Sequence, residues 1–175
     1  MKMTKIIMAL VFSVSALAAL AAAPLTVTLN AIDADGVGKP VGTIRAEDGK
    51  EGLVLTVALQ GLAPGDHGFH VHENPSCGLK EKDGKPVAGL AAGGHYDPAK
   101  TGKHTGPSAQ GHLGDLPALS VDTKGNAKGR LVAPRLKLAD LKGRSIMIHE
   151  GGDNYADSPK PLGGGGARIA CGVVP

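Results

Sequence analysis

The chain has 175 residues, of which 42% are hydrophobic and only 2% aromatic, with no tryptophan. This length suggests a single domain, and its core must be built from aliphatic side chains. The formal net charge is +3 and falls to +1 once residues 1–23, which carry two lysines and no acidic residue, are left out. A nearly neutral domain lacks the basic stripe that nucleic-acid binding needs, so we expect no nucleic-acid partner.

Residues 1–23 are predicted to be a secretory signal peptide, followed by one domain over residues 24–175. Lys2 and Lys5 precede an apolar run that ends in small residues with A-x-A cleavage sites. The run is long enough for a transmembrane anchor, but its alanine-rich end favours cleavage. We therefore expect an exported protein that has no membrane anchor once the signal is removed.

The first half of the domain is predicted to consist of strands, because apolar and polar residues alternate. Asp35-Gly36 and Asp48-Gly49 are typical of turns between antiparallel strands. The expected strands lie at residues 25–30, 41–46, 53–59 and 67–72.

The alternation stops between residues 73 and 117, where glycine, proline and charged residues dominate. A stretch of this length without regular structure is uncommon in a compact domain unless it is functional. It contains Cys77 and four candidate metal ligands, His95, His104, His112 and Asp115. A metal ion and a disulfide would supply the order that packing cannot.

Strands are predicted again at residues 119–122, 127–133, 145–149 and 168–174. A corner is expected at 136–141 and a second long loop, rich in glycine and proline, at 150–166. Eight short strands, two long loops and no convincing helix indicate an all-β protein, a β-sandwich or flattened barrel.

His70 and His72 lie two positions apart in an expected strand and therefore share one face. One or both could be ordinary surface histidines, since short motifs occur by chance. With His149 on another strand, these imidazoles form a flat set of nitrogens that suits copper(II). The long loop adds a set of nitrogen and oxygen ligands that suits a closed tetrahedral zinc site, namely His95, His104, His112 and Asp115. The residues alone thus indicate two metals, one redox-capable and one structural.

Cys77 and Cys171 are the only cysteines. In an exported chain two cysteines most simply form one disulfide. Metal ligation is the alternative, which the absence of a C-x-x-C motif and the supply of histidines make less favourable.

Four motifs resemble those of the copper,zinc superoxide dismutases: GFHVHE at 68–73, GGHYDP at 93–98, GHLGDLP at 111–117 and GARIACG at 166–172. The resemblance covers essentially the whole domain. It implies an eight-stranded Greek-key flattened barrel with two long functional loops, and one copper and one zinc per subunit. It also implies an enzyme that disproportionates superoxide, a small anionic substrate, to oxygen and hydrogen peroxide, as an antioxidant defence outside the cytoplasm.

The resemblance also implies roles for individual residues. Arg168 matches the arginine that docks superoxide, Asp153 matches a carboxylate behind the metal ligands, and Cys77 and Cys171 match the family's disulfide. His95 would bridge both metals as an imidazolate and move a proton in the reaction. The implied copper ligands are His70, His72, His95 and His149, and the implied zinc ligands are His95, His104, His112 and Asp115. For Arg168 a plain surface arginine is the alternative. His67 falls outside the pattern and is interpreted as a structural histidine bonded to backbone.

The sequence departs from the eukaryotic members of this family. Segment 74–92 is longer and more charged, and loop 150–166 has a single basic residue. Both features resemble the bacterial exported, periplasmic branch, so the eukaryotic dimer interface cannot be carried over and a homodimer is left open. Lys80, Lys82 and Lys85 are either a solvated loop or a replacement for the eukaryotic steering loop.

Two other functions are alternatives. A periplasmic copper or zinc carrier on the same scaffold would be expected to lack a copper ligand or the docking arginine. A zinc hydrolase would need an open coordination position. The complete ligand set and Arg168 favour the dismutase.

Overall fold

The computed structural model describes residues 22–175. The predicted signal peptide at 1–23 lies almost wholly outside the described residues. Within the described part of the chain, no helix has the length and apolar character needed to cross a membrane.

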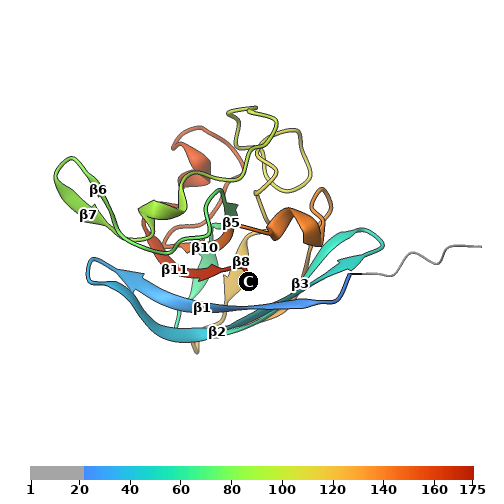
Figure 1. Ribbon diagram of the computed structural model, residues 1–175, viewed down its shortest axis with the longest axis horizontal. Coiled ribbons are helices and arrows are strands. Elements are labelled where there is room, and N and C mark those ends of the chain that lie inside the picture. Colours follow the sequence, from blue (N-terminus) through green and yellow to red (C-terminus); the bar gives the residue numbers. More distant parts are fainter. Residues whose placement is uncertain (1–21) are drawn as a thin grey trace, which may run out of the picture.

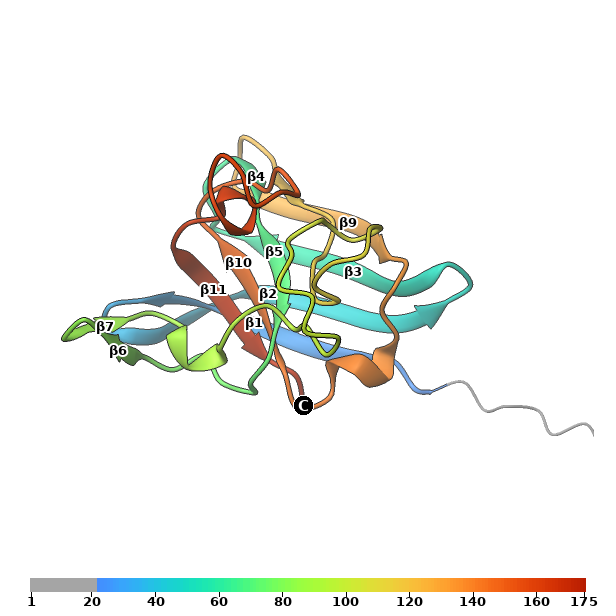
Figure 2. The same ribbon diagram turned by 90° about the horizontal axis from the view of Figure 1, so that it is seen from above.

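An antiparallel sheet of seven strands forms the body of the molecule, in the order β5-β10-β11-β1-β2-β3-β9. Figures 1 and 2 show that the sheet curls, with β1, β2 and β3 opposite β5 and β10. The strands are β1 (Leu25–Asp33), β2 (Gly36–Gly49), β3 (Gly52–Gln60), β5 (Phe69–His72), β9 (Asn126–Ala133), β10 (Ser145–His149) and β11 (Arg168–Val173). A separate pair joins β4 (Gly65–His67) to β8 (Leu119–Val121). The all-β fold and all eight predicted strand segments are confirmed.

One predicted strand, residues 67–72, is divided in two at Gly68. The Gly68 N–H donates to the carbonyl of Gly151, and its carbonyl accepts from the N–H of His149. The chain therefore changes partner at this point, from β8 on one side to β10 on the other. This exchange carries the curl of the sheet around to the pair β4–β8.

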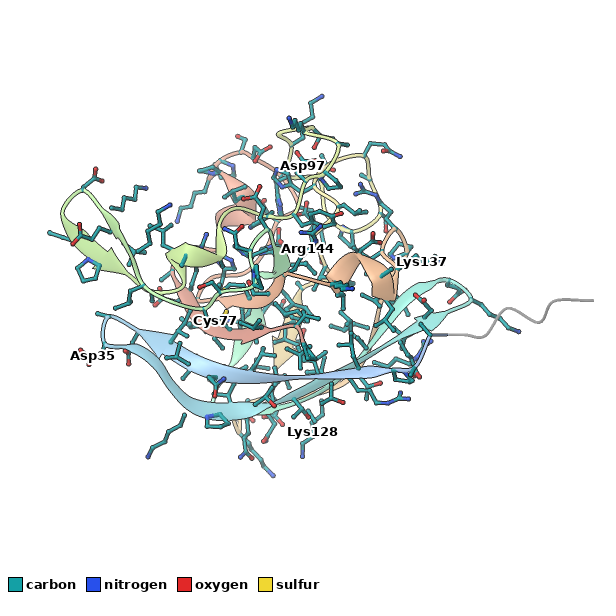
Figure 3. All side chains as sticks on the ribbon, viewed as in Figure 1. Asp35, Cys77, Asp97, Lys128, Lys137 and Arg144 are labelled. Atoms are coloured by element: carbon teal, nitrogen blue, oxygen red, sulfur yellow. A yellow bond between two sulfur atoms is a disulfide. The ribbon has the colours of Figure 1, made fainter. Side chains whose placement is uncertain are left out.

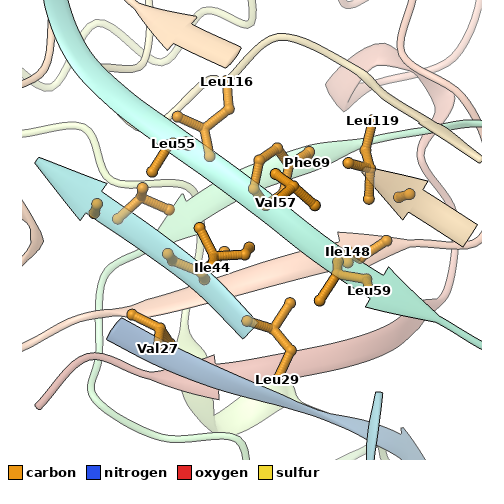
Figure 4. Close-up of a cluster of buried hydrophobic side chains, with 14 of the residues drawn as sticks. Val27, Leu29, Ile44, Leu55, Val57, Leu59, Phe69, Leu116, Leu119 and Ile148 are labelled. Carbon is orange, nitrogen blue, oxygen red and sulfur yellow. The ribbon is translucent and has the colours of Figure 1, made fainter. Parts of the chain in front are cut away.

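The core is aliphatic, as the composition indicated, with Phe69 as its only fully buried aromatic side chain among the described residues. Figure 4 shows side chains from opposing strands, such as Leu29, Ile44 and Ile148, packing against one another. In β3 the buried Leu55, Val57 and Leu59 alternate with exposed residues, as one-sided burial of a strand requires. Each such side chain contributes about 1.5–3 kcal/mol when fully buried.

Two long loops lie on the side of the barrel opposite β1 and β2 (Figures 1 and 3). The first, after β5, contains a short hairpin of β6 (Lys80–Lys82) and β7 (Lys85–Val87) and the 3₁₀ turn η1 (Leu90–Ala92). These elements were not predicted, because three-residue strands with exposed charged side chains leave no apolar alternation. The second loop contains the 3₁₀ turn η3 (Leu162–Gly164), and the predicted corner forms η2 (Leu138–Leu141).

The predicted disulfide between Cys77 and Cys171 is confirmed, with a Cα–Cα distance of 5.7 Å. It joins the first loop to β11, and both cysteines are buried with Ile32, Ala92 and Met147 in a small second cluster. The alternative in which the thiols bind metal is therefore wrong.

Candidate metal centre

The seven predicted ligand residues converge in one buried cluster, although they come from β5, β10 and the first loop. None exposes more than 8% of its surface. Phe69 and Val71 point into the core, so that His70 and His72 project from the opposite face of β5 toward the loops. The rings of His70 and His95 are stacked, with centroids 3.8 Å apart.

A first group consists of four histidines, His70, His72, His95 and His149, with ligand nitrogens that all lie within 4.8 Å of one another. Nδ1–H of His72 donates to the carbonyl of Gly93, and Nδ1–H of His149 donates to that of Gly166. Their Nε2 atoms then present lone pairs to each other at 3.4 Å. Two facing lone pairs repel, and a cation between them turns this repulsion into binding. The donor set therefore fits copper, which favours imidazole nitrogen.

A second group surrounds Asp115. Its carboxylate oxygens lie 3.0 Å from Nδ1 of His95, 3.0 Å from Nδ1 of His104 and 3.5 Å from Nδ1 of His112. In this second group, one ligand atom from each of four residues lies within 4.8 Å of the other three, and these residues are His70, His95, His104 and Asp115. His112 lies just outside this set, but its Nδ1 is buried without a hydrogen-bond partner. Three imidazole nitrogens around one carboxylate fit a tetrahedral zinc ion.

His95 belongs to both groups. Its Nδ1 faces Asp115, whereas its Nε2 is buried without a hydrogen-bond partner on the side of the first group. An imidazole with two differently facing nitrogens can join two sites through one side chain.

Asp153, from the second loop, lies behind both groups. Its two carboxylate oxygens accept hydrogen bonds from Nε2–H of His70, at 2.8 Å, and from Nε2–H of His104, at 2.7 Å. Because each bond uses one ring nitrogen, the Nδ1 atoms of both histidines are left to face the centre.

Arg168 is partly buried at the start of β11, and its guanidinium is fixed by backbone carbonyls. Nη1 donates to the carbonyl of Gly89 at 2.5 Å and Nη2 to that of Gly93 at 2.7 Å. The Gly93 carbonyl also accepts from His72, so one atom positions both side chains. Gly93 has φ +79°, and a Cβ there would come within 2.6 Å of Glu73 Oε2, so this turn requires glycine.

Burial governs the charge of the first group. Desolvation lowers the pKa of His70 to about 3 and that of His149 to about 4, and it lowers the pKa of His72 and His95 as well. The positive charge of Arg168 adds to the lowering at His72 and His149. These imidazoles are therefore neutral at physiological pH, which is the form that binds metals.

The carboxylates behave in the opposite way. Burial alone would raise the pKa of Asp115 and Asp153, but their hydrogen bonds to the histidines hold both well below the usual range. Burial likewise opposes the protonation of His104, yet these two carboxylates raise its pKa to about 9.

His67 contacts only backbone through its ring, as predicted. Its nitrogens lie 2.7 Å from the carbonyl oxygen of His149 and 2.8 Å from that of Ala63. Sequence reasoning missed two other residues near the cluster: Asp157 accepts the N–H of His104, and Arg135 donates to the carbonyl of His112. Both act on main-chain atoms, which no spacing of side chains reveals.

Comparison with known proteins agrees with this geometry. The model of the family described as copper/zinc superoxide dismutase matches residues 41–174. A superoxide dismutase [Cu-Zn] of Brucella abortus is 59% identical over 140 residues, which cover 79% of this chain and 81% of that protein.

Two solved structures are also similar. The Cu/Zn superoxide dismutase from Brucella abortus has a TM-score of 0.86 and 55% identity, covering 87% of this chain and 100% of that one. The monomeric copper, zinc superoxide dismutase from Salmonella enterica has a TM-score of 0.79 and 53% identity, with the same coverage. The fold, the double cluster of histidines and these matches together show that the chain belongs to the copper/zinc superoxide dismutase family.

Proposed function

We propose that this chain disproportionates superoxide to oxygen and hydrogen peroxide at a copper ion that shares His95 with a structural zinc ion. The observation that carries the proposal is the pair of buried ligand groups that meet at His95. We assign copper to His70, His72, His95 and His149, because four imidazole nitrogens suit copper. We assign zinc to His95, His104, His112 and Asp115, because a mixed set of nitrogen and oxygen suits zinc.

When bound, copper supplies the one-electron chemistry, and zinc supplies fixed positive charge. The protein's own residues handle the anion and a proton. Nε2 of His95 is the atom at which a proton is held and released, since Nδ1 of that ring is occupied on the Asp115 side. Two superoxide ions and two protons give one oxygen and one hydrogen peroxide, so each turnover needs such a proton relay.

Arg168 is proposed to attract and orient superoxide. Two carbonyls hold its guanidinium, so its fork of donors is positioned before the anion arrives and costs little reorganisation. Its influence on the pKa of His72 and His149 supports a position close to the copper ligands.

We further propose that the protein is exported, in keeping with a periplasmic location. The charged and apolar pattern of residues 1–23 supports this. So does the disulfide, since such bonds persist in oxidising compartments. One similar structure is named as monomeric. A homodimer of this chain stays a prediction that sedimentation of the metal-loaded protein would test.

The proposal is tested by loading metal-free protein with copper and zinc and measuring superoxide removal together with metal content. We expect activity that depends on copper and one equivalent of each metal per chain. A metal carrier would bind both ions and leave superoxide untouched, and a zinc hydrolase would be active with zinc alone. Either result would overturn the proposal.

A further inference from the structure

His112 differs from four of the other proposed histidine ligands in how its ring is oriented. His70, His72, His104 and His149 each bind a fixed acceptor through the ring nitrogen that faces away from the centre. For His112, the hydrogen bonds that the structure describes are made by its main chain. It is also the most exposed of the seven residues, at 8%. Its position therefore depends on how its backbone is held.

Arg135 holds that backbone. Its Nη2 donates to the carbonyl of Gly111 at 2.9 Å, and its Nη1 donates to the carbonyl of His112 at 3.2 Å. On the other side, the N–H of His112 donates to the carbonyl of Lys103 at 2.8 Å. A Cβ on Gly111 would come within 2.5 Å of that same carbonyl. The Gly111–His112 segment is thus enclosed between the loop backbone at Lys103 and the guanidinium of Arg135.

Arg135 is itself well anchored, although it lies in a corner between β9 and η2. Ala133, two residues before it, pairs with Leu53 in the sheet, and Leu136, directly after it, is fully buried in the core. The N–H of Leu136 donates to the carbonyl of Ala133, which closes the turn. The guanidinium therefore extends from a rigid part of the barrel to residues 111 and 112, in a part of the first loop that has no regular structure.

We infer that Arg135 is a positioning residue for the zinc ligand His112, which it orients through the carbonyls of residues 111 and 112. The inference rests on the proposed zinc site. A planar guanidinium can reach two carbonyls at once, whereas an ammonium is a single point charge. Mutation of a residue that supports a metal ligand in this way typically lowers the metal affinity by about 10–100-fold.

The test compares Arg135→Ala and Arg135→Lys with Arg130→Ala, which removes an exposed arginine of β9. Zinc release to a chromophoric chelator and the absorption spectrum of cobalt(II) in the zinc site are measured for each protein. We expect zinc release from Arg135→Ala to be faster by about 10-fold or more, with an altered cobalt spectrum. Arg135→Lys should be intermediate, and Arg130→Ala should match wild type.

The melting temperature of each metal-free variant separates positioning from a purely structural role. A variant that melts earlier but keeps the wild-type zinc release rate and cobalt spectrum would overturn the inference. Arg135→Lys keeps the charge and the stem, so it provides a folded variant even if Arg135→Ala does not fold. His112→Ala tests the site itself: if it binds zinc as tightly as wild type, the proposed zinc site fails, and this inference with it.

Discussion

In the first group, His70, His72 and His149 are each oriented by a hydrogen bond from the ring nitrogen that faces away from the centre of the group. His72 and His149 use backbone carbonyls, whereas His70 uses the carboxylate of Asp153. These contacts fix both the ring plane and the tautomer. The lone pairs that face the centre are therefore set before any metal arrives, which limits the entropy lost on binding.

His149→Ala should abolish dismutase activity and leave zinc bound, because His149 contributes to the proposed copper group alone. Activity, copper content and zinc content of the loaded variant are the measurements. His67→Gln serves as a control that removes a buried histidine without removing a ligand. More than a trace of activity in His149→Ala would contradict the copper assignment.

The metal-free protein should be most stable near pH 6.5. In the folded protein the histidines of the first group have lowered pKa values, about 4 for His149 against the unperturbed 6.5. Between these two pH values the unfolded chain therefore binds more protons than the folded chain, and the free energy of unfolding falls as the pH drops from 6.5 to 4. His104, with its pKa raised to about 9, stabilises the fold fully below pH 6.5 and loses that effect as pH rises through 9.

Denaturant unfolding of the metal-free protein across this range measures both limbs. His104→Gln should flatten the limb between pH 6.5 and 9 and leave the acid limb in place. A stability that still declines in the same way above neutrality in this variant would show that another group is responsible.

At the scale of elements, the two irregular loops can position metal ligands because a disulfide and hydrogen bonds fix these loops to other parts of the fold. The first loop is fixed by the disulfide to β11 and by Arg168 through Gly89 and Gly93. The second loop is fixed by Asp153 and by Asp157, which accepts the N–H groups of His104 and Leu162. Neither loop has an apolar core of its own, so contacts of this kind with the rest of the fold help to fix its conformation.

Loss of the disulfide should both destabilise the fold and lower activity. The bridge closes a loop of 94 residues, which corresponds to about 4–5 kcal/mol in the chain-entropy model. Since Cys171 is three positions from Arg168, the guanidinium should also become less well placed. The double variant Cys77→Ser, Cys171→Ser is compared with wild type by urea unfolding and by superoxide removal. Unchanged values of both would contradict the prediction.

Asp115→Ala should empty the second group, because this carboxylate lies against three imidazoles. The loss of zinc affinity should exceed the roughly 10–100-fold that removal of a supporting residue causes. The melting temperature of the zinc-loaded protein should fall as well, since a bound ligand stabilises the folded state. Unchanged zinc content at equal melting temperature would refute the assignment, and Asp122→Ala, on an exposed turn, is a matched control.

For the whole molecule, the net charge is too small to attract superoxide over long distances, so local fields must act. The exposed β6–β7 hairpin carries Lys80, Lys82 and Lys85 with Glu81 and Asp83. Figures 1 and 2 show it projecting from the barrel beside the β1–β2 turn. Its base leads into Gly89, which binds Arg168.

Changing these three lysines to glutamine should lower the catalytic rate and weaken the dependence of that rate on ionic strength. The reason is that salt screens the field of exposed charges beyond about 8 Å at physiological ionic strength. The rate is measured from low to high salt for wild type, for the triple variant and for a control in which Lys124, Lys128 and Lys137 are changed. A wild-type rate and salt slope in the triple variant would show that the hairpin is only solvated.

Most of the barrel could be predicted from sequence because one-sided burial leaves an alternating pattern. The predicted strand at 145–149 has the same bounds as β10. The break at Gly68 could not be predicted, since its cause is a hydrogen bond to Gly151 far along the chain. The ligand types were visible as motifs, whereas Arg135 and Asp157 act on carbonyl and N–H groups that every residue possesses.

The pairing of β5 with β10 has a consequence for how the chain matures. His70 lies opposite Met147, and Ser145 lies opposite His72, so the histidines of β5 meet His149 only after more than half of the domain has been made. Arg168 and Cys171 follow later still. An unfinished chain therefore has no complete copper group to offer, because all four proposed copper ligands are present only once β10 has been made. Copper uptake would thus report that β5 and β10 have paired.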